Sequence, residues 1–481
     1  MASAWPSEQV MALSPTAVAV RRGQTLANAA KWSVLGAHEQ AVWGECEGRG
    51  KALYRTIVDL SGPAFRCSCS SRQFPCKHAI GLFLLLTEQA LFPAAELPAW
   101  VEKWLVQRRH SPSKGRSHRQ VQTAMPTNDT KSSADAAIQT AQAQKRFEKR
   151  AAKVEAGLID LEQWLQDLLR SGLADLPAQP YRFWDQAATR LVDAQAPGLA
   201  RRVRALASIP NSGSGWPERM LKALGQLYVL VQSYRQLDIL GVSEQSAVED
   251  ALRAPSGSAL RAQILTQIGF TQKQEDLFQR SQQPDAEVLA LSDTWQVLGK
   301  VVTEEDSLKT QRVWLWGMQH RRAALVLSFA HGRRQQLDNS LVPGTSFRGQ
   351  LVFYPGTGVQ RAFVASREGA AEGVRADIGA ENVEDAIAHY AQSLTENPWQ
   401  THYPLVLSQV VLRYESSQWW LQDAKESALP IAAEFTQGWS LLAMSGGRPL
   451  SVFGEWDGDT LQPLSVWSEK KFMALHNSGV R

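Results

Sequence analysis

The chain has 481 residues, of which 44% are hydrophobic and 20% are charged, and this ordinary globular composition excludes wholesale disorder. At roughly 150 residues per domain, the length predicts about three domains. Residues 1–120 hold 15 Lys and Arg against 8 Asp and Glu, so their net charge is +7, whereas the whole chain carries only +4.

The sequence also indicates the compartment. All four cysteines lie in one short window near the N-terminus, which is not the pattern of a protein held together by disulfides. The longest apolar stretch, near residues 79–86, is far shorter than the ~20 residues that cross a bilayer. The N-terminus lacks the charged and apolar regions of a secretory signal. We therefore expect a cytoplasmic protein with no membrane partner.

Residues 1–106 are expected to form an N-terminal module. Two β-like runs, residues 41–47 and 53–60, flank a glycine-containing turn and predict a hairpin. Residues 79–92 are apolar on nearly every face, which predicts a buried helix. Residues 100–109 predict a second, amphipathic helix.

A change in composition marks the end of this module. Residues 107–144 are poor in aromatic side chains and rich in Ser, Thr, Gln and Ala, with a basic start, so we expect a flexible linker there. Residues 145–285 are expected to form an all-helical domain. Apolar residues recur at helical spacing from Val154 to Leu169, and Pro197-Gly198 separates two further helices.

Residues 286–481 are expected to form a β-rich domain, because their apolar residues alternate with a period of two. One helical insertion fits residues 383–394. Nine of the 17 tryptophans fall in this region. Most of them are expected in the core, because a tryptophan buries a large apolar area. The alternative is an exposed aromatic platform for a peptide or a nucleic-acid base.

One short motif carries recognisable chemistry. Cys67 and Cys69 are followed, after six residues, by Cys76 and His78. In an extended segment Cys67 and Cys69 project to the same face with Cα atoms about 6.6 Å apart. Their sulfurs can converge to the ~3.8 Å separation that two Zn–S bonds of ~2.3 Å require in a tetrahedron. Pro75 places Cys76 just before a helix and His78 in its first turn.

The donor set predicts one structural zinc ion. Three thiolates and one imidazole close a tetrahedral site, and no fifth ligand stands nearby. The alternatives are a redox pair of cysteines or three small buried hydrophobes. Cys46 lies outside the motif and is expected to be a small buried side chain.

The motif and its flanks resemble the SWIM zinc finger, whose pattern is C-x-C, a variable gap and C-x-H. The finger would cover about residues 50–90. More broadly, residues 62–65, 190–199 and 454–458 are similar to stretches in bacterial SWIM-domain proteins. The resemblance implies DNA binding or protein interaction, and it implies MoxR-type AAA+ ATPases and von Willebrand A-domain proteins as partners.

The predicted fold class is therefore multidomain α+β. It consists of a small ββα zinc-finger module, a central all-α helical domain and a C-terminal β-rich domain.

Binding functions fit the sequence better than catalysis. We find no phosphate-binding loop, nucleophile elbow, zinc-protease helix or dinucleotide fingerprint, so an enzyme is not expected. The first prediction is an adaptor for a protein partner. The alternative is sequence-nonspecific nucleic-acid binding through the basic first quarter. The candidate contacts for nucleic acid are Arg66, Arg72, Lys77 and Arg116.

Overall fold

The structure is a computed structural model and has the predicted α+β class. It describes residues 7–14, 17–47, 53–71, 75–88, 92–109, 133–237, 257–270, 272–283, 288–305, 308–332, 337–358, 360–374, 378, 382–468 and 471–475. Within this part of the chain, no helix is both long and apolar enough to cross a membrane.

The N-terminal module is a four-stranded antiparallel sheet covered by helices on both faces. Its strands lie in the order β1 (Trp32–Ala37), β2 (Ala41–Glu47), β3 (Leu53–Asp59) and β4 (Ala64–Cys67). One face carries α3 (Lys77–Glu88), on which pack the short helices α1 (Ser7–Ala12) and α2 (Ala17–Gln24). The other face carries α4 (Ala99–Arg109). The predicted hairpin and buried helix are therefore present.

The position of α3 explains why it is apolar on nearly every side. It lies between the sheet and the helices α1 and α2. At most 1% of the surface is exposed for each of Ile80, Leu82, Phe83, Leu84 and Leu85. Gly23 of α2 and Gly81 of α3 let these two helices approach closely. A Cβ atom on Gly23 would lie 2.6 Å from Ile80 Cγ2.

The central part of the chain is a helical bundle. Its main helices are α5 (Ser133–Ser171), α6 (Tyr181–Asp193), α7 (Pro197–Ala205), α8 (Trp216–Arg235) and α10 (Gly257–Ile268). They share one apolar core that includes Leu158, Trp184 and Leu227. Helix α5 begins at Ser133, inside the segment 107–144 that is predicted to be a linker. Residues 110–132 of that segment lie outside the described residues.

The β-rich region contains two β units instead of a single one. The first is a closed barrel in the order β5-β6-β7-β9-β8, with α11 (Gln274–Ser281) beside it. Its strands are β5 (Ala290–Glu305), β6 (Leu308–Gly317), β7 (Arg322–His331), β8 (Thr345–Phe353) and β9 (Gln360–Gly373).

The second β unit is a six-stranded sheet in the order β12-β11-β10-β13-β14-β15. Helix α12 (Val383–Glu396), at the place of the predicted insertion, packs on it together with α13 (Gly438–Ser445). The strands are β10 (Tyr403–Glu415), β11 (Gln418–Gln422), β12 (Ala428–Pro430), β13 (Leu450–Trp456), β14 (Leu461–Ser468) and β15 (Lys471–Ala474).

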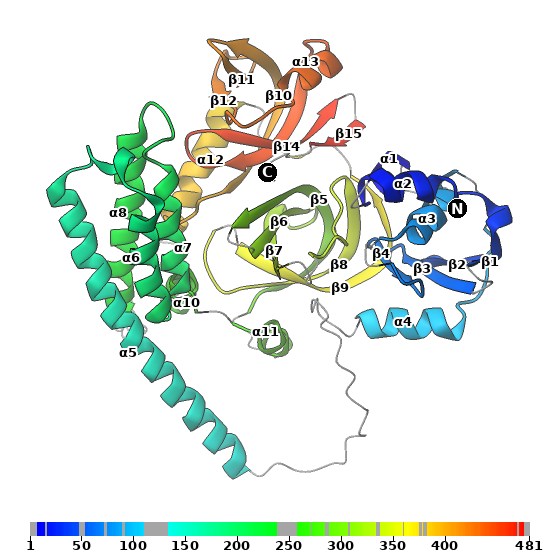
Figure 1. Cartoon of the computed structure of the whole chain (residues 1–481), viewed down its shortest axis with the longest axis horizontal. Coiled ribbons are helices and arrows are strands. Elements are labelled where there is room, and N and C mark those ends of the chain that lie inside the picture. The colour runs from blue at the N-terminus through cyan, green and yellow to red at the C-terminus, as the bar shows by residue number, and fades with distance from the viewer. Residues whose placement is uncertain are drawn as a thin grey trace.

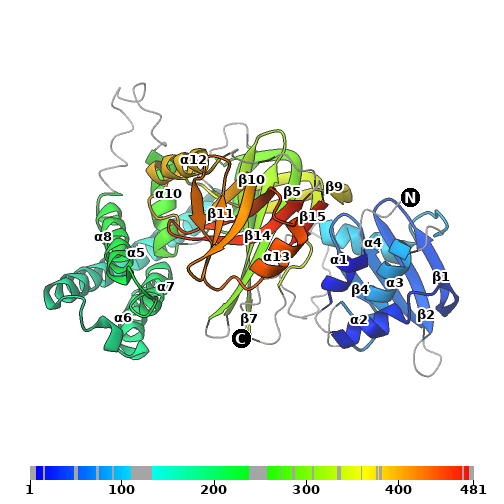
Figure 2. The same ribbon diagram turned by 90° about the horizontal axis from the view of Figure 1, so that it is seen from above.

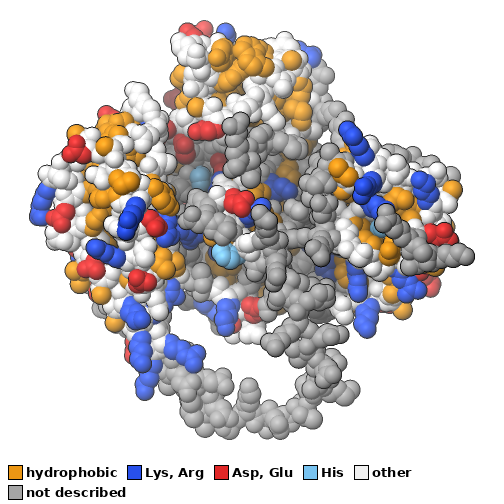
Figure 3. Space-filling view, in the orientation of Figure 1, with side chains coloured by type: hydrophobic (Ala, Val, Ile, Leu, Met, Phe, Trp, Pro, Cys, Tyr) orange, Lys and Arg blue, Asp and Glu red, His pale blue; other side chains and the backbone are white. Residues whose placement is uncertain are grey.

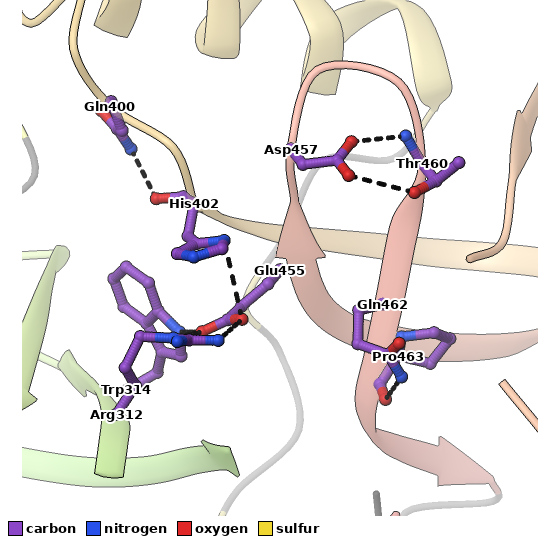
Figure 4. Close-up of polar contacts among 9 residues, drawn as sticks. All are labelled: Arg312, Trp314, Gln400, His402, Glu455, Asp457, Thr460, Gln462 and Pro463. Atoms are coloured by element: carbon purple, nitrogen blue, oxygen red, sulfur yellow. Dashed lines mark hydrogen bonds and ion pairs between the residues drawn. The ribbon is translucent and has the colours of Figure 1, made fainter. Parts of the chain in front are cut away.

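A buried ion pair joins the two β units. Arg312 of β6 donates two hydrogen bonds of 2.9 Å to the carboxylate of Glu455 on β13, and the indole of Trp314 donates a third of 2.8 Å. The imidazole of His402 lies 3.9 Å from the same carboxylate, as Figure 4 shows. Asp457, which follows on the chain, accepts backbone hydrogen bonds in the tight turn between β13 and β14. We call the group Arg312, Trp314, His402 and Glu455 the barrel–sheet junction.

The barrel occupies the centre of the molecule, with the N-terminal module on one side and the helical bundle on the other (Figures 1 and 2). The module is joined to the barrel by a backbone hydrogen bond from Ala371 to Leu60 (3.0 Å). The bundle is joined to the segment before β10 by hydrogen bonds from Arg202 and Gln226 to backbone carbonyls of residues 398–399.

Candidate metal centre

Two structural elements bring the four predicted ligands together. Cys67 is the last residue of β4, paired with Thr56 of β3, and Cys69 follows it in a bend just beyond the strand. Cys76 immediately precedes α3, and its carbonyl accepts the first helical hydrogen bond, from Ile80 (3.0 Å). His78 lies in the first turn of α3. The placement of Cys76 before the helix and His78 inside it is as the sequence predicts.

The ligand atoms form a cluster of the size that a zinc ion requires. One ligand atom from each of Cys67, Cys69, Cys76 and His78 can be chosen so that all lie within 4.8 Å of one another. The Nδ1 atom of His78 lies 3.8 Å from the Cys67 sulfur and 4.0 Å from the Cys76 sulfur. These separations are close to the ~3.8 Å edge of a tetrahedron of sulfurs around zinc.

The geometry identifies the histidine nitrogen that the sequence could not. Nδ1 of His78 faces the sulfurs, so Nδ1 is the nitrogen placed to bind the metal. The ring of His78 is held by Tyr54 of β3, whose ring centre lies 5.1 Å away. Three sulfurs and one imidazole nitrogen are the donors of a closed zinc site, and these residues fit one structural zinc ion.

The cluster is buried on its helix side and partly open on its strand side. Cys76 has 1% and His78 has 4% of its surface exposed, whereas Cys67 and Cys69 are half-buried. A hydrogen bond from the Cys76 thiol, together with bonds from His78 and the Thr56 hydroxyl, outweighs burial and lowers the pKa of Cys67 to about 4. The same pairing and burial raise the pKa of Cys76. A bound cation stabilises the thiolate form of all three cysteines.

Cys46 does not belong to the cluster. Its side chain is 2% exposed in the core between the sheet and α3, and desolvation by this burial raises the pKa of its thiol. It behaves as the small buried side chain that the sequence predicts.

The structure describes two of the four predicted nucleic-acid contacts. Arg66 and Lys77 are exposed next to the ligands in the chain. Arg72 and Arg116 lie outside the described residues. Sequence reasoning missed the contribution of Tyr54 and Thr56, because both come from β3 and reach the ligands only after the sheet has formed.

A second candidate feature lies at the far end of the six-stranded sheet. Most of the tryptophans of this region are buried as expected, including Trp295, Trp314 and Trp467. Trp439 is different, because 61% of its surface is exposed. Its ring centre lies 5.1 Å from that of Tyr414 and 4.9 Å from that of Trp419. We call Tyr414, Trp419 and Trp439 the aromatic cluster.

Comparison with known proteins agrees with the metal site and with the bundle. The family model of the SWIM zinc finger matches residues 57–86, and that of the SWIM-associated four-helix bundle domain matches residues 149–252. No curated protein and no solved structure gives a significant match to the chain. With a SWIM zinc finger whose four ligands meet in space and the helical bundle associated with that finger, the chain is a SWIM domain-containing protein.

Proposed function

We propose that this SWIM protein is an adaptor that binds a protein partner, with zinc in a structural role. The observation that carries the proposal is the aromatic cluster. Tyr414 and Trp439 expose 47% and 61% of their surface, although side chains of this size are normally buried. Tyrosine and tryptophan are enriched at the centres of protein interfaces.

The three rings of the aromatic cluster already pack against one another in the structure. The rings come from β10, β11 and α13, and their centres lie 4.8 to 5.1 Å apart. Gly438 lets α13 begin directly on the ring of Trp419, because a Cβ atom there would lie 2.2 Å from the indole. Figure 3 shows hydrophobic side chains gathered over this tip of the molecule. Rings that are already ordered lose little freedom on binding.

The closed zinc site supports the same proposal. Its four donors leave no position for a substrate, so zinc fixes the N-terminal module and does no chemistry. The resemblance to bacterial SWIM-domain proteins suggests a MoxR-type AAA+ ATPase or a von Willebrand A-domain protein as the partner.

A binding measurement with matched variants tests the proposal. The affinity of the full chain for a purified MoxR-type ATPase, and for a von Willebrand A-domain protein, is measured by calorimetry. Trp439→Ala should weaken binding about thirtyfold, as expected for an interface hot spot. Tyr228→Ala, on α8, is the control, because Tyr228 is 44% exposed and lies far from the aromatic cluster along the chain. Equal affinities for the wild type and Trp439→Ala would contradict the proposal.

Nucleic-acid binding is the second candidate function. Arg66 and Lys77 support it, because both are exposed beside the metal ligands. Helix α3 is buried between the sheet and two other helices and cannot enter a groove, so any such binding would be electrostatic and nonspecific.

Salt-dependent titration of a labelled DNA duplex tests this second function. The double variant Arg66→Gln/Lys77→Gln should reduce the slope of log affinity against log salt by about 0.9 for each phosphate that the chain no longer neutralises. Arg190→Gln, an exposed change in the bundle, should leave the slope unchanged. Absence of binding at low salt would remove this candidate.

A further inference from the structure

The barrel closes through only a short stretch of pairing between two of its strands. Strands β7 and β9 pair in parallel through only three residue pairs, from Ala324–Gln360 to Val326–Ala362. By contrast, β7 pairs with β6 along its whole length. Beyond Val326 and Ala362 both strands continue, but the described residues form no further pairs between them. The two strands therefore separate and leave two facing edges.

The backbone of both edges points into the gap. Tyr354 N–H donates to the carbonyl of Arg361, so the backbone of Arg361 faces β8. Because successive residues of a strand face opposite neighbours, the backbones of Ala362 and Val364 face β7. The register with β7 then directs the backbone of Phe329 toward β9. Neither Phe329 nor Val364 has a backbone partner across the gap among the described residues.

A cleft of about 980 Å³ occupies the gap. Strands β7 and β9 form its walls, and α4 of the N-terminal module and the start of α11 contribute to its sides. The lining combines apolar rings, such as Trp104 and Phe329, with arginines and with acidic side chains such as Asp338 and Glu368. A volume of this size is at the upper end of pockets that hold a ligand.

Arg361 indicates the charge of the occupant. Its guanidinium lies 4.4 Å from the ring centre of Tyr354 and 5.7 Å from that of Phe329, at the wall of the cleft. Its Nε atom is buried and has no hydrogen-bond partner among the described residues. A buried donor of this kind is costly unless an acceptor reaches it, and a carboxylate is the strongest acceptor for a guanidinium.

We propose that the cleft between β7 and β9 binds an extended peptide segment of a partner protein as an added β-strand. The segment pairs with the backbone of Phe329, Val364 or both, and it carries an acidic side chain that reaches Arg361. Unpaired strand edges recognise another strand through backbone hydrogen bonds, which is why the occupant is an extended peptide and not a compact surface. This site is separate from the aromatic cluster and does not depend on it.

Selection from a random library of ten-residue peptides on phage, against the full zinc-loaded chain, tests the proposal. Enriched peptides should be extended sequences that contain Asp or Glu. Phe329→Pro should weaken their binding at least about tenfold, because it removes the N–H that faces the cleft. Phe329 lies opposite Thr310 of β6, but its N–H faces the cleft, so the same change spares the backbone hydrogen bonds between β7 and β6. Phe329→Ala keeps the N–H and should bind nearly as well as the wild type.

Hydrogen exchange on the wild-type chain provides a second measurement, which does not depend on the folding of any variant. An enriched peptide should slow the exchange of the Phe329 or Val364 amide. Trp439→Ala should leave peptide binding unchanged, so this site and the proposed adaptor function can fail separately. The proposal is overturned if no peptide is enriched, if enriched peptides bind Phe329→Pro as well as the wild type, or if a nucleic acid and no peptide protects these amides.

Discussion

The metal centre and the barrel–sheet junction are both buried groups of charge, but they are neutralised in different ways. The metal centre takes its ligands from residues 67 to 78, and its thiolates need a cation that the chain does not supply. The junction pairs Arg312 with Glu455, which are 143 residues apart, and so supplies its own counter-ion. A local motif can therefore use a metal, whereas a contact between two folded units can use an ion pair.

The difference has a consequence for stability. The metal centre should make the N-terminal module depend on zinc, while the rest of the chain should not. The junction should make the barrel and the six-stranded sheet depend on each other, whatever the metal content.

Removal of zinc is expected to have the largest effect. A chelator should unfold the sheet β1–β4 and α3, because metal binding to a structural zinc site contributes on the order of 10 kcal/mol of folding free energy. The helical bundle has its own apolar core and should stay folded. Hydrogen exchange of the full chain, with and without the chelator, measures both regions. If the N-terminal module keeps its protection against hydrogen exchange after complete zinc removal, its fold does not depend on the metal.

Loss of one partner at the junction is expected to have the next largest effect. Arg312→Met leaves the Glu455 carboxylate buried without its cation, and it should lower the free energy of unfolding of the two β units by about 3–5 kcal/mol. The double variant Arg312→Met/Glu455→Leu removes both charges and should recover much of this stability. Urea unfolding followed by tryptophan fluorescence measures each variant. If the single variant is as stable as the wild type, the junction does not hold the units together.

Acid should weaken the junction by a smaller amount. Burial alone would raise the pKa of Glu455, but hydrogen bonds and charge interactions with Arg312, His402 and Trp314 outweigh it and lower the pKa. Burial lowers the pKa of His402. Each group then stabilises the fold above its unfolded pKa, which is about 6.5 for His and about 4.3 for Glu. The stabilisation is lost as the pH falls through the folded value.

Urea midpoints of the β units at pH 7, 5.5 and 4 measure this effect. The wild type should lose stability step by step on acidification. Arg312→Met/Glu455→Leu should lose less, because the carboxylate is absent. Identical pH dependence in the two proteins would show that Glu455 does not contribute.

The parts of the molecule that sequence could predict are those encoded locally. Cys67, Cys69, Cys76 and His78 lie close together in the chain, so their spacing alone indicates zinc. An uninterrupted apolar run likewise predicts the buried α3, and apolar residues at helical spacing predict the helical bundle. The division of residues 286–481 into a barrel and a sheet was not predictable from a period of two, because strands of both units have the same pattern.

Long-range contacts account for what was missed. Tyr54 reaches His78 only through the pairing of β3 with β4, and the aromatic cluster forms only when α13 packs against β10 and β11. The turn at Asp457 was predictable from its Asp-Gly sequence, but the partner of Glu455 was not. Nothing near Glu455 in the chain points to Arg312.

Metal analysis of three purified proteins tests the central claim most directly. The wild type and Cys46→Ala should each contain one zinc ion per chain, because Cys46 is buried outside the cluster. Cys76→Ala should contain none or bind zinc far more weakly, since it removes the ligand that precedes α3. Full zinc retention in Cys76→Ala, or loss of zinc in Cys46→Ala, would contradict the assignment of the metal centre.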